Sequence, residues 1–227
     1  MNIAIIPARG GSKRIPKKNI KQFCGKPMIA YAIDAARSSG LFEHVVVSTD
    51  DKEIARVAKD LGAEIPFIRP GSLSTDYIET VPVISHATKL CIELGWSFKQ
   101  VCCIYPAVPF IQAEDLKGAL TSLINEGADY CFPVSEYPSA PQRALKFLEK
   151  GRMAPFYPEY ELVRTQDLEP TYFDVGQFYW GVNDAWLNNS KIHSSGLGYV
   201  IPSWRVVDID TDADWKRAEL LYKSLNG

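Results

Sequence analysis

After Met1 the chain opens with Asn2-Ile-Ala-Ile-Ile-Pro-Ala-Arg-Gly-Gly-Ser-Lys-Arg-Ile-Pro-Lys-Lys-Asn19, the stretch that decides its fold class. The apolar run at residues 3–6 has the length and composition of a buried strand, which Pro7 ends. The loop that follows carries five positive charges in a chain of net charge −2: Arg9, Lys13, Arg14, Lys17 and Lys18. The stretch therefore predicts a buried strand followed by a basic, glycine-rich loop.

Apolar runs and helical patterns alternate along the chain beyond this loop. We expect strands at residues 45–47, 65–68, 100–105 and 130–134. We expect helices at residues 27–39, from Asp50 or Asp51 as cap to 61, at about 79–94 and at about 113–125. Strands that alternate with helices of this length indicate βαβ units and an α/β fold with a parallel sheet.

The alternation stops between residue 135 and about residue 174. Five prolines interrupt this segment, and Glu149-Lys-Gly-Arg152 predicts a hairpin turn within it. We interpret residues 135–174 as an arm inserted into a single domain of residues 1–227. Regular structure is expected to resume with strands at 176–180, 199–201 and 206–210 and a helix over about 212–225.

The composition excludes several classes of protein. Hydrophobic residues make up 46% and charged residues 23%, as in globular proteins, and the slightly acidic balance argues against nucleic-acid binding. There is no run of eighteen apolar residues and no charged leader, so we expect a cytoplasmic protein without a membrane partner. The five cysteines have neither disulfide nor zinc spacing, and Cys102 and Cys103 are expected in the core.

The basic loop has the chemistry of a polyphosphate cradle. It follows the first strand, and open α/β sheets bind ligands at the carboxyl ends of their strands. Gly10 and Gly11 would let backbone amides approach an anion, and Ser12 can donate its hydroxyl. The alternative is a solvated basic loop. Neither the P-loop pattern nor G-x-G-x-x-G occurs, which argues against a P-loop NTPase and a dinucleotide-binding fold.

A second polar motif is Val207-Asp-Ile-Asp-Thr-Asp-Ala-Asp214. In a strand over 206–210, Asp208 and Asp210 would point to the same face, because side chains alternate with period two. Two neighbouring carboxylates suit Mg²⁺. We expect Asp212 to cap the last helix.

A calcium-binding loop is the alternative interpretation of this motif. Four of the five fixed EF-hand positions match, at Asp208, Asp210, Asp212 and Glu219. Ala213 replaces the glycine that the sharp turn requires, and the preceding segment predicts a strand where an EF-hand has a helix. Both departures argue against calcium.

The loop from Ile6 to Asn19 resembles the first motif of the CMP-sialic acid synthetases, also called acylneuraminate cytidylyltransferases. The resemblance continues in the same order over nearly the whole chain. It implies a Rossmann-like three-layer α/β/α nucleotidyltransferase fold with a mainly parallel sheet, and a homodimer formed through the arm. It also implies nucleotide contacts from Ala8, Arg9, Gly10, Gly11, Ser12, Lys13, Lys18 and Asn19.

The resemblance extends to the base and the metal. Within Ile68–Thr80, Arg69 would face the cytosine carbonyl, while Thr80 and the backbone near Ile78 would read the base. A helix start, with Thr75 or Asp76 as N-cap, is the other interpretation of this stretch. The family's metal ligands fall on Asp208 and Asp210, which implies Mg²⁺ as cofactor, with Mn²⁺ as the alternative.

The sugar side departs from the sialic acid pattern. Tyr105-Pro-Ala-Val-Pro-Phe110 stands where that pattern has Gln-Pro-Thr-Ser-Pro-Leu, and Asp174–Gly181 replaces Asn-Gly-Ala-Ile-Tyr. With Ala140–Leu145, these segments resemble the branch that acts on pseudaminic acid, a deoxygenated and doubly N-acylated relative of sialic acid. The implied sugar-binding residues are Tyr105, Arg143, Arg164, Gln166, Gln177 and Tyr179.

The implied reaction is transfer of CMP from CTP to the anomeric hydroxyl of the nine-carbon acid sugar, with release of pyrophosphate. Positioning and charge neutralisation would supply catalysis, through Arg9, Lys13, Lys18, Asp208 and Asp210. N-acetylneuraminic acid, legionaminic acid and Kdo are alternative sugars. A non-catalytic nucleotide-binding module and a glycosyltransferase are alternatives of other classes. We expect His44, His86 and His193 to be structural, because the sequence suggests no partner for them.

Overall fold

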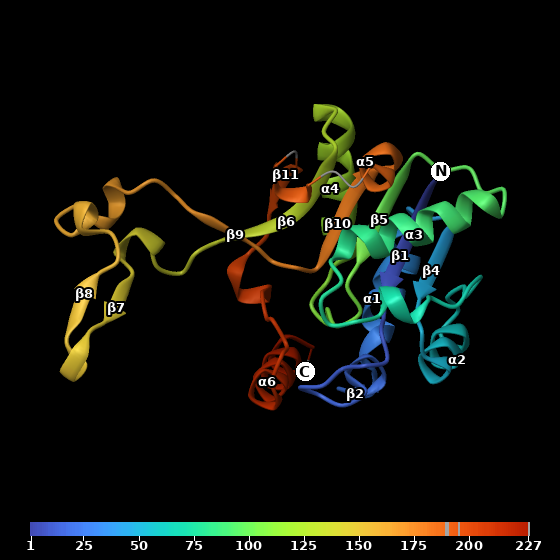
Figure 1. The fold of residues 1–227 in the computed structure, drawn as a ribbon, viewed down its shortest axis with the longest axis horizontal. Helices are drawn as coiled ribbons and strands as arrows, with labels where there is room; N and C mark the ends of the chain where they lie inside the picture. Colours follow the sequence, from blue (N-terminus) through green and yellow to red (C-terminus); the bar gives the residue numbers. More distant parts are fainter. Residues whose placement is uncertain (189–190, 195, 227) are drawn as a thin grey trace.

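A sheet of seven strands forms the centre of the computed structural model, which describes residues 1–188, 191–194 and 196–226 (Figure 1). The spatial order is β11-β6-β10-β5-β1-β4, with β9 paired to β6. The strands are β1 Asn2–Pro7, β4 His44–Ser48, β5 Gln100–Ile104, β6 Tyr130–Glu136, β9 Tyr172–Asp174, β10 Phe178–Val182 and β11 Gly196–Val200.

The sheet is mainly parallel, as the sequence predicted. β1 pairs in parallel with both β4 and β5, and β6 pairs in parallel with β11. β10 runs antiparallel between β5 and β6, a reversal that the sequence pattern did not indicate. Because β1 and β5 are neighbours of equal direction, the loops after them meet at one edge of the sheet.

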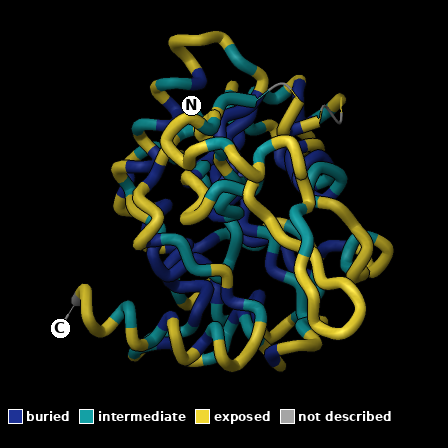
Figure 2. The backbone as a smooth tube through the Cα atoms, turned by 90° about the vertical axis from the view of Figure 1, so that its left-hand side faces the viewer, coloured by how far each residue is buried: buried dark blue, intermediate teal, exposed yellow. Residues whose placement is uncertain are grey.

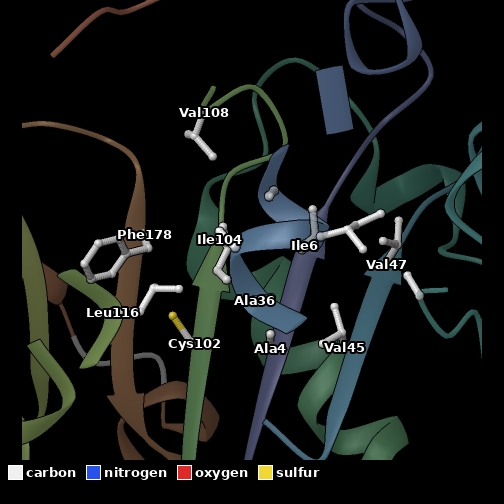
Figure 3. Close-up of a cluster of buried hydrophobic side chains, with 14 of the residues drawn as sticks. Ala4, Ile6, Ala36, Val45, Val47, Cys102, Ile104, Val108, Leu116 and Phe178 are labelled. Carbon is white, nitrogen blue, oxygen red and sulfur yellow. The ribbon is translucent and has the colours of Figure 1, made fainter. Parts of the chain in front are cut away.

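Helices cover both faces of the sheet, which confirms the three-layer α/β/α fold. α1 (Met28–Ser39), α2 (Lys52–Asp60) and α4 (Ala113–Glu126) share one apolar cluster with the sheet, drawn in Figure 3. α3 (Thr80–Glu93) and α5 (Asn183–Leu187) share the cluster on the other face. Alternate residues of β1 enter the two clusters, as a strand buried on both faces requires.

Two residues set the ends of the first helices. The carboxylate of Asp51 caps α2, because its Oδ1 accepts from the amides of Glu53 at 2.7 Å and Ile54 at 2.9 Å. Gly40 ends α1 in the left-handed region, with φ of 67°. The cap of α2 is thus the second of the two predicted aspartates.

The strand predicted at residues 65–68 is wrong. Pairing with β4 stops at Glu64, which forms an isolated parallel bridge with Val46. Pro66 has no amide hydrogen to continue the pairing, so the chain leaves the sheet edge in an irregular course.

The strand predicted at residues 206–210 is also wrong. A short 3₁₀ helix at Ser203–Arg205 leads into an irregular segment that leaves the sheet. Its Ile209 is 1% exposed and packs in a third apolar cluster with Phe23 and Trp215. The segment is held by this packing and has no neighbouring strand in the described part of the chain.

α6 (Asp212–Asn226) follows and packs over the small hairpin of β2 (Gln22–Phe23) and β3 (Lys26–Pro27). The predicted cap Asp212 is wrong, because Asp212 already lies inside the helix. Thr211 is the cap: its Oγ1 accepts from the amide of Asp214 at 3.2 Å, and the Asp214 carboxylate accepts from the amide of Thr211 at 2.9 Å. This reciprocal pair is a capping box.

The arm projects from the sheet and ends in the hairpin of β7 (Leu145–Phe147) and β8 (Met153–Pro155) (Figure 1). The hairpin turn predicted at Glu149–Arg152 is confirmed, and a 3₁₀ helix at Glu149–Gly151 forms most of it. Figure 2 faces the arm and shows it mostly exposed; no residue from 136 to 176 is buried. Phe147 and Leu162 are 81% and 95% exposed, an unusual state for large apolar side chains.

Short 3₁₀ helices occur at Lys18–Ile20, Gly71–Leu73, Pro141–Arg143, Glu149–Gly151, Pro158–Tyr160, Thr165–Asp167, Ile192–Ser194 and Ser203–Arg205. Among the described residues, no helix has both the length and the apolar character needed to cross a membrane.

Candidate active site

A pocket of about 600 Å³ opens where the loops after β1 and β5 meet. The start of α3 and the segment before α6 complete its wall. Its lining residues are Pro7, Arg9, Ser12, Lys13, Arg14, Ile15, Lys18, Asn19, Arg69, Leu73, Thr75, Asp76, Ile78, Glu79, Thr80, Val83, Tyr105, Pro106 and Asp210. The pocket therefore gathers most of the nucleotide-binding residues expected from the sequence.

Two cations of the first loop converge on one carboxylate. Arg9 Nη1 lies 2.6 Å from Asp76 Oδ1, and Lys13 Nζ lies 2.5 Å from Asp76 Oδ2. The hydrogen bond and charge of Lys13, followed by those of Arg9, hold the pKa of Asp76 below its usual value. Asp76 was considered as a helix cap, but α3 begins four residues later at Thr80. Its carboxylate instead holds the two cations together as an anionic ligand would.

A second pair of cations meets Asp210. Arg14 Nη1 lies 2.8 Å from Asp210 Oδ2, and Lys18 Nζ lies 3.5 Å from Oδ1 while donating to the carbonyl of Ile209 at 2.5 Å. Asp208 is exposed and does not line the pocket. Because residues 206–210 form no strand, the alternation that predicted both carboxylates on one face does not apply here, and only Asp210 lines the pocket.

The backbone of the first loop is fixed by polar contacts. The buried side chain of Asn19 donates to the carbonyl of Arg9 at 3.0 Å, and the amide of Gly10 donates to Asp50 Oδ1 at 3.0 Å. Ala8 is fully buried in the core. A Cβ at Gly10 would lie 2.7 Å from Asp51 Oδ2, whereas a Cβ at Gly11 would meet nothing within 4 Å. Gly10 is therefore required by packing, and Gly11 leaves open space beside the loop.

Arg69 is a buried cation on the pocket wall, only 4% exposed. Its Nε donates to Ser74 Oγ at 3.1 Å, and its Nη2 lies 3.8 Å from Asp50 Oδ1. Burial lowers the pKa of Arg69, and the charge of Asp50 opposes that effect. Asp50 thus bridges the first loop and the arginine expected at the base.

Tyr105 connects this pocket to a second one. Its hydroxyl lies 2.5 Å from Thr80 Oγ1, and its ring lies 5.5 Å from that of Tyr179, centroid to centroid. Burial raises the pKa of Tyr105 to about 12, against the opposite effect of its hydrogen bonds with Thr80 and Tyr179. Thr80 and Tyr105 line both the first pocket and a neighbouring cavity of about 690 Å³, and Tyr179 lines that cavity.

The other expected sugar-binding residues are separated from the pocket. Arg143 donates to the carbonyl of Val163 at 2.8 Å, and Arg164 Nε pairs with Asp167 at 2.7 Å, both within the arm. Gln166 lies on the arm too, and none of these three residues lines the pocket of its own chain. Gln177 is 5% exposed, and its Oε1 has no hydrogen-bond partner among the described residues.

Two histidines have partners that the sequence did not suggest. His44 Nδ1 lies 2.9 Å from Glu64 Oε1, and its ring stacks on Trp96. His193 Nε2 lies 2.8 Å from Asp174 Oδ2 and faces the second cavity. His86 Nδ1 is buried without a hydrogen bond among the described residues, and burial lowers the pKa of its ring.

Sequence reasoning missed Asp50, Asp76 and Asp174 as site residues. Asp50 could have been found, because it follows a strand that was predicted beside the first one, at the edge where ligands bind. Asp76 and Asp174 have no such local signal. Across residues 1–188, 191–194 and 196–226 there is no group of three or more His, Cys, Asp or Glu side chains that could hold a metal ion.

Comparisons with known proteins agree with this geometry. A family model described as cytidylyltransferase matches residues 3–147. The pseudaminic acid cytidylyltransferase of Campylobacter jejuni is 41% identical over 225 residues, which cover 98% of this chain and 96% of that protein. The CMP-N,N'-diacetyllegionaminic acid synthase of Legionella pneumophila is 31% identical, with coverage of 96% and 95%.

A solved structure of CMP:2-keto-3-deoxy-manno-octonic acid synthetase complexed with CTP is similar to this one, with a TM-score of 0.72 over 99% of both chains. At 16% identity, this likeness shows a common fold. The family model and the 41% identical relative carry the assignment further, because each spans more than half of the chain. The chain therefore belongs to the cytidylyltransferase family of nucleotidyltransferase enzymes.

Proposed function

We propose that this enzyme transfers CMP from CTP to the anomeric hydroxyl of pseudaminic acid and releases pyrophosphate. The observation that carries the proposal is that Arg9, Lys13 and Lys18 of the first loop line one pocket together with the buried Arg69. With Arg14, five cationic side chains line this pocket of about 600 Å³, which suits a nucleoside triphosphate. The Campylobacter jejuni relative, named for pseudaminic acid, supports the choice of sugar.

The first loop supplies the charge for the reaction. As the anomeric oxygen bonds to the α-phosphorus, the bond to the β-phosphate oxygen breaks and pyrophosphate leaves. Arg9 and Lys13 would exchange Asp76 for the phosphate oxygens and stabilise the charge of the leaving group. Lys18 donates to the carbonyl of Ile209, and this hydrogen bond would hold its charge in the pocket near the phosphates. Ser12 and Asn19 would fix the loop and orient the nucleotide.

Recognition of the base would fall to residues outside the first loop. Arg69 is held by Ser74 and Asp50 with its guanidinium at the pocket, where it can donate to the cytosine carbonyl. Thr80 and Ile78 line the same pocket. Because these groups are held before binding, they would select the base with little reorganisation.

Asp208 and Asp210 would hold Mg²⁺, or Mn²⁺ in its place. Both offer the hard oxygen ligands that these ions prefer; Asp210 lines the pocket, and Asp208 is exposed on the other side of Ile209 in sequence. The ion would neutralise charge on the phosphate oxygens. Arg14 pairs with Asp210 at 2.8 Å, so Asp210, to serve as a ligand of the ion, would release Arg14.

The metal proposal is tested with Asp210→Ala. This variant should lose Mg²⁺-dependent pyrophosphate release and keep the melting temperature of the wild type. Turnover at the wild-type rate would remove Asp210 from the metal site. Asp212→Ala is the matched control, because Asp212 lies two residues away, is 82% exposed and does not line the pocket.

The sugar is tested by pyrophosphate release with CTP and each of pseudaminic acid, N-acetylneuraminic acid, legionaminic acid and Kdo. Pseudaminic acid should give the highest kcat/KM. A higher value with another sugar would change the assigned substrate and leave the assigned reaction, transfer of CMP, unchanged. Binding of CTP without turnover of any acid sugar would instead favour a non-catalytic nucleotide-binding module.

The arm supports a homodimer. It exposes Phe147, Leu162 and Phe156, and aromatic and aliphatic groups of this kind are typical of buried interfaces. Arg143, Arg164 and Gln166 lie on the same arm, so in a dimer they would serve the partner's sugar site. Their separation from the pocket of their own chain is then expected.

A further inference from the structure

Three side chains form a hydrogen-bonded group on the wall of the second cavity. Asp174 Oδ2 accepts from the hydroxyl of Tyr179 and from His193 Nε2, each at 2.8 Å. Asp174 Oδ1 accepts from the amide of Gly176, also at 2.8 Å. With three donors on its two oxygens, this carboxylate holds both neighbours in fixed orientations.

The group continues into the nucleotide pocket. The ring of Tyr179 packs against that of Tyr105, whose hydroxyl in turn meets Thr80. Side-chain contacts therefore connect Thr80 to His193 through Tyr105, Tyr179 and Asp174. His193 is its exposed end, with a side chain that is 66% exposed, and its ring stands edge-on to Phe132.

The cavity has the position and size for the second substrate. Its volume is about 690 Å³, and Glu79, Thr80 and Tyr105 line both it and the nucleotide pocket. A molecule in the cavity would therefore lie next to a nucleotide bound in the first pocket. Glu79, Lys191, His193 and Ser194 give its wall polar groups for a hydroxylated, amide-bearing ligand.

We propose that His193, oriented by Asp174 and packed against Phe132, is a specificity-determining residue that binds an acylamino group of the acid sugar. The inference rests on the proposed function, because it assigns the second cavity to the sugar. Asp174 accepts a hydrogen bond and so requires the proton on Nε2, which leaves Nδ1 of the neutral ring as an acceptor. An amide N–H of the sugar is the donor that this acceptor fits.

The two ring nitrogens give a test with conservative variants. Asparagine places its amide near the position of Nδ1, and glutamine places its amide near that of Nε2. His193→Asn should therefore keep the KM for pseudaminic acid within about threefold of the wild type. His193→Gln and His193→Ala should each raise it about tenfold, the effect of losing one hydrogen bond. The KM for CTP should stay within about twofold in all three.

His44→Gln is the matched control, because His44 is bound to Glu64 at the opposite end of the sheet. It should leave both KM values unchanged. Thermal melting of each His193 variant should match the wild type, since the side chain is mostly exposed. Asp174→Asn should also raise the KM for the sugar, because an amide cannot accept from all three donors.

The inference would be overturned if His193→Ala left the KM for pseudaminic acid within twofold, or raised the KM for CTP equally. It would also be overturned if glutamine restored binding better than asparagine. A wild-type enzyme that releases no pyrophosphate from CTP with any of the four acid sugars would refute the proposed function itself, and the assignment of His193 with it.

Discussion

The two adjacent glycines of the first loop should respond differently to alanine. At Gly10 the new Cβ would lie 2.7 Å from Asp51 Oδ2 and 2.9 Å from Asp51 Cβ, well inside normal contact. Asp51 must then move, and its carboxylate would lose the hydrogen bonds that cap α2. At Gly11 the new Cβ would meet nothing within 4 Å, and no unusual backbone angle opposes it.

The expected cost of Gly10→Ala is the loss of the cap together with local strain, about 1–2 kcal/mol. For a chain of 227 residues this corresponds to a fall in melting temperature of about 2–8 °C. Gly11→Ala should change stability by less than about 0.5 kcal/mol. It should instead raise the KM for CTP about tenfold, because its methyl group occupies the open space into which the phosphates would come.

Thermal melting, urea unfolding and pyrophosphate-release kinetics measure these effects. Repeating Gly10→Ala in an Asp51→Gly variant tests whether the clash with Asp51 is the cause. Asp51→Gly removes the clashing atoms, and glycine is itself a tolerable cap. In that background Gly10→Ala should cost almost nothing. Equal destabilisation by the two alanine variants, or an undiminished cost of Gly10→Ala beside Asp51→Gly, would refute the reasoning.

Three further predictions concern charge, core and assembly. Asp76→Asn should lower the KM for CTP a few-fold at low salt, because the triphosphate no longer has to displace a carboxylate from Arg9 and Lys13. The effect should be smaller at high salt, which screens these charges. A higher KM for CTP would show instead that Asp76 helps to bind CTP. Asp115→Ala should lower the free energy of unfolding in urea by about 3–5 kcal/mol, because it leaves Arg205 buried without the partner that it contacts at 2.5 and 3.1 Å. Asp34→Ala, which breaks an exposed pair with Lys26, should cost under about 1 kcal/mol. Equal losses of stability in the two variants would contradict the argument. Phe147→Glu combined with Leu162→Glu should convert the proposed dimer into a monomer in light scattering without unfolding the core, whereas an unchanged mass would exclude the arm as the interface.

Local sequence patterns were reliable where contacts are local. The buried strand at residues 3–6, the helix after Pro27 and the turn at Glu149–Gly151 all follow from residues within a few positions of one another. The basic loop was recognisable for the same reason: its charges and glycines are consecutive, and its place after a strand sets its place at the sheet edge. Arg69 and Thr80 needed the family resemblance, because one arginine and one threonine carry no pattern by themselves.

The two wrong strands show where such patterns fail. Residues 65–68 and 206–210 are apolar enough for strands, but a strand exists only where a neighbour accepts its hydrogen bonds. Pro66 ends pairing at the sheet edge, and the packing of Ile209 against Phe23 and Trp215 draws the second segment away from the sheet. Both outcomes depend on what lies beside the segment in space.

The sequence by itself determined the kind of chemistry: a basic loop after the first strand, a pair of aspartates near the end, and an α/β fold that brings strand ends to one edge. Only the tertiary structure decided which charges meet. Asp76 is 67 residues from Arg9 in sequence yet forms an ion pair with its guanidinium, and Asp174 contacts His193, which is 19 residues further along the chain. The physical reason is that such pairs depend on strand order and direction, including the reversed β10, which arise from the packing of the whole chain and not from neighbours in sequence.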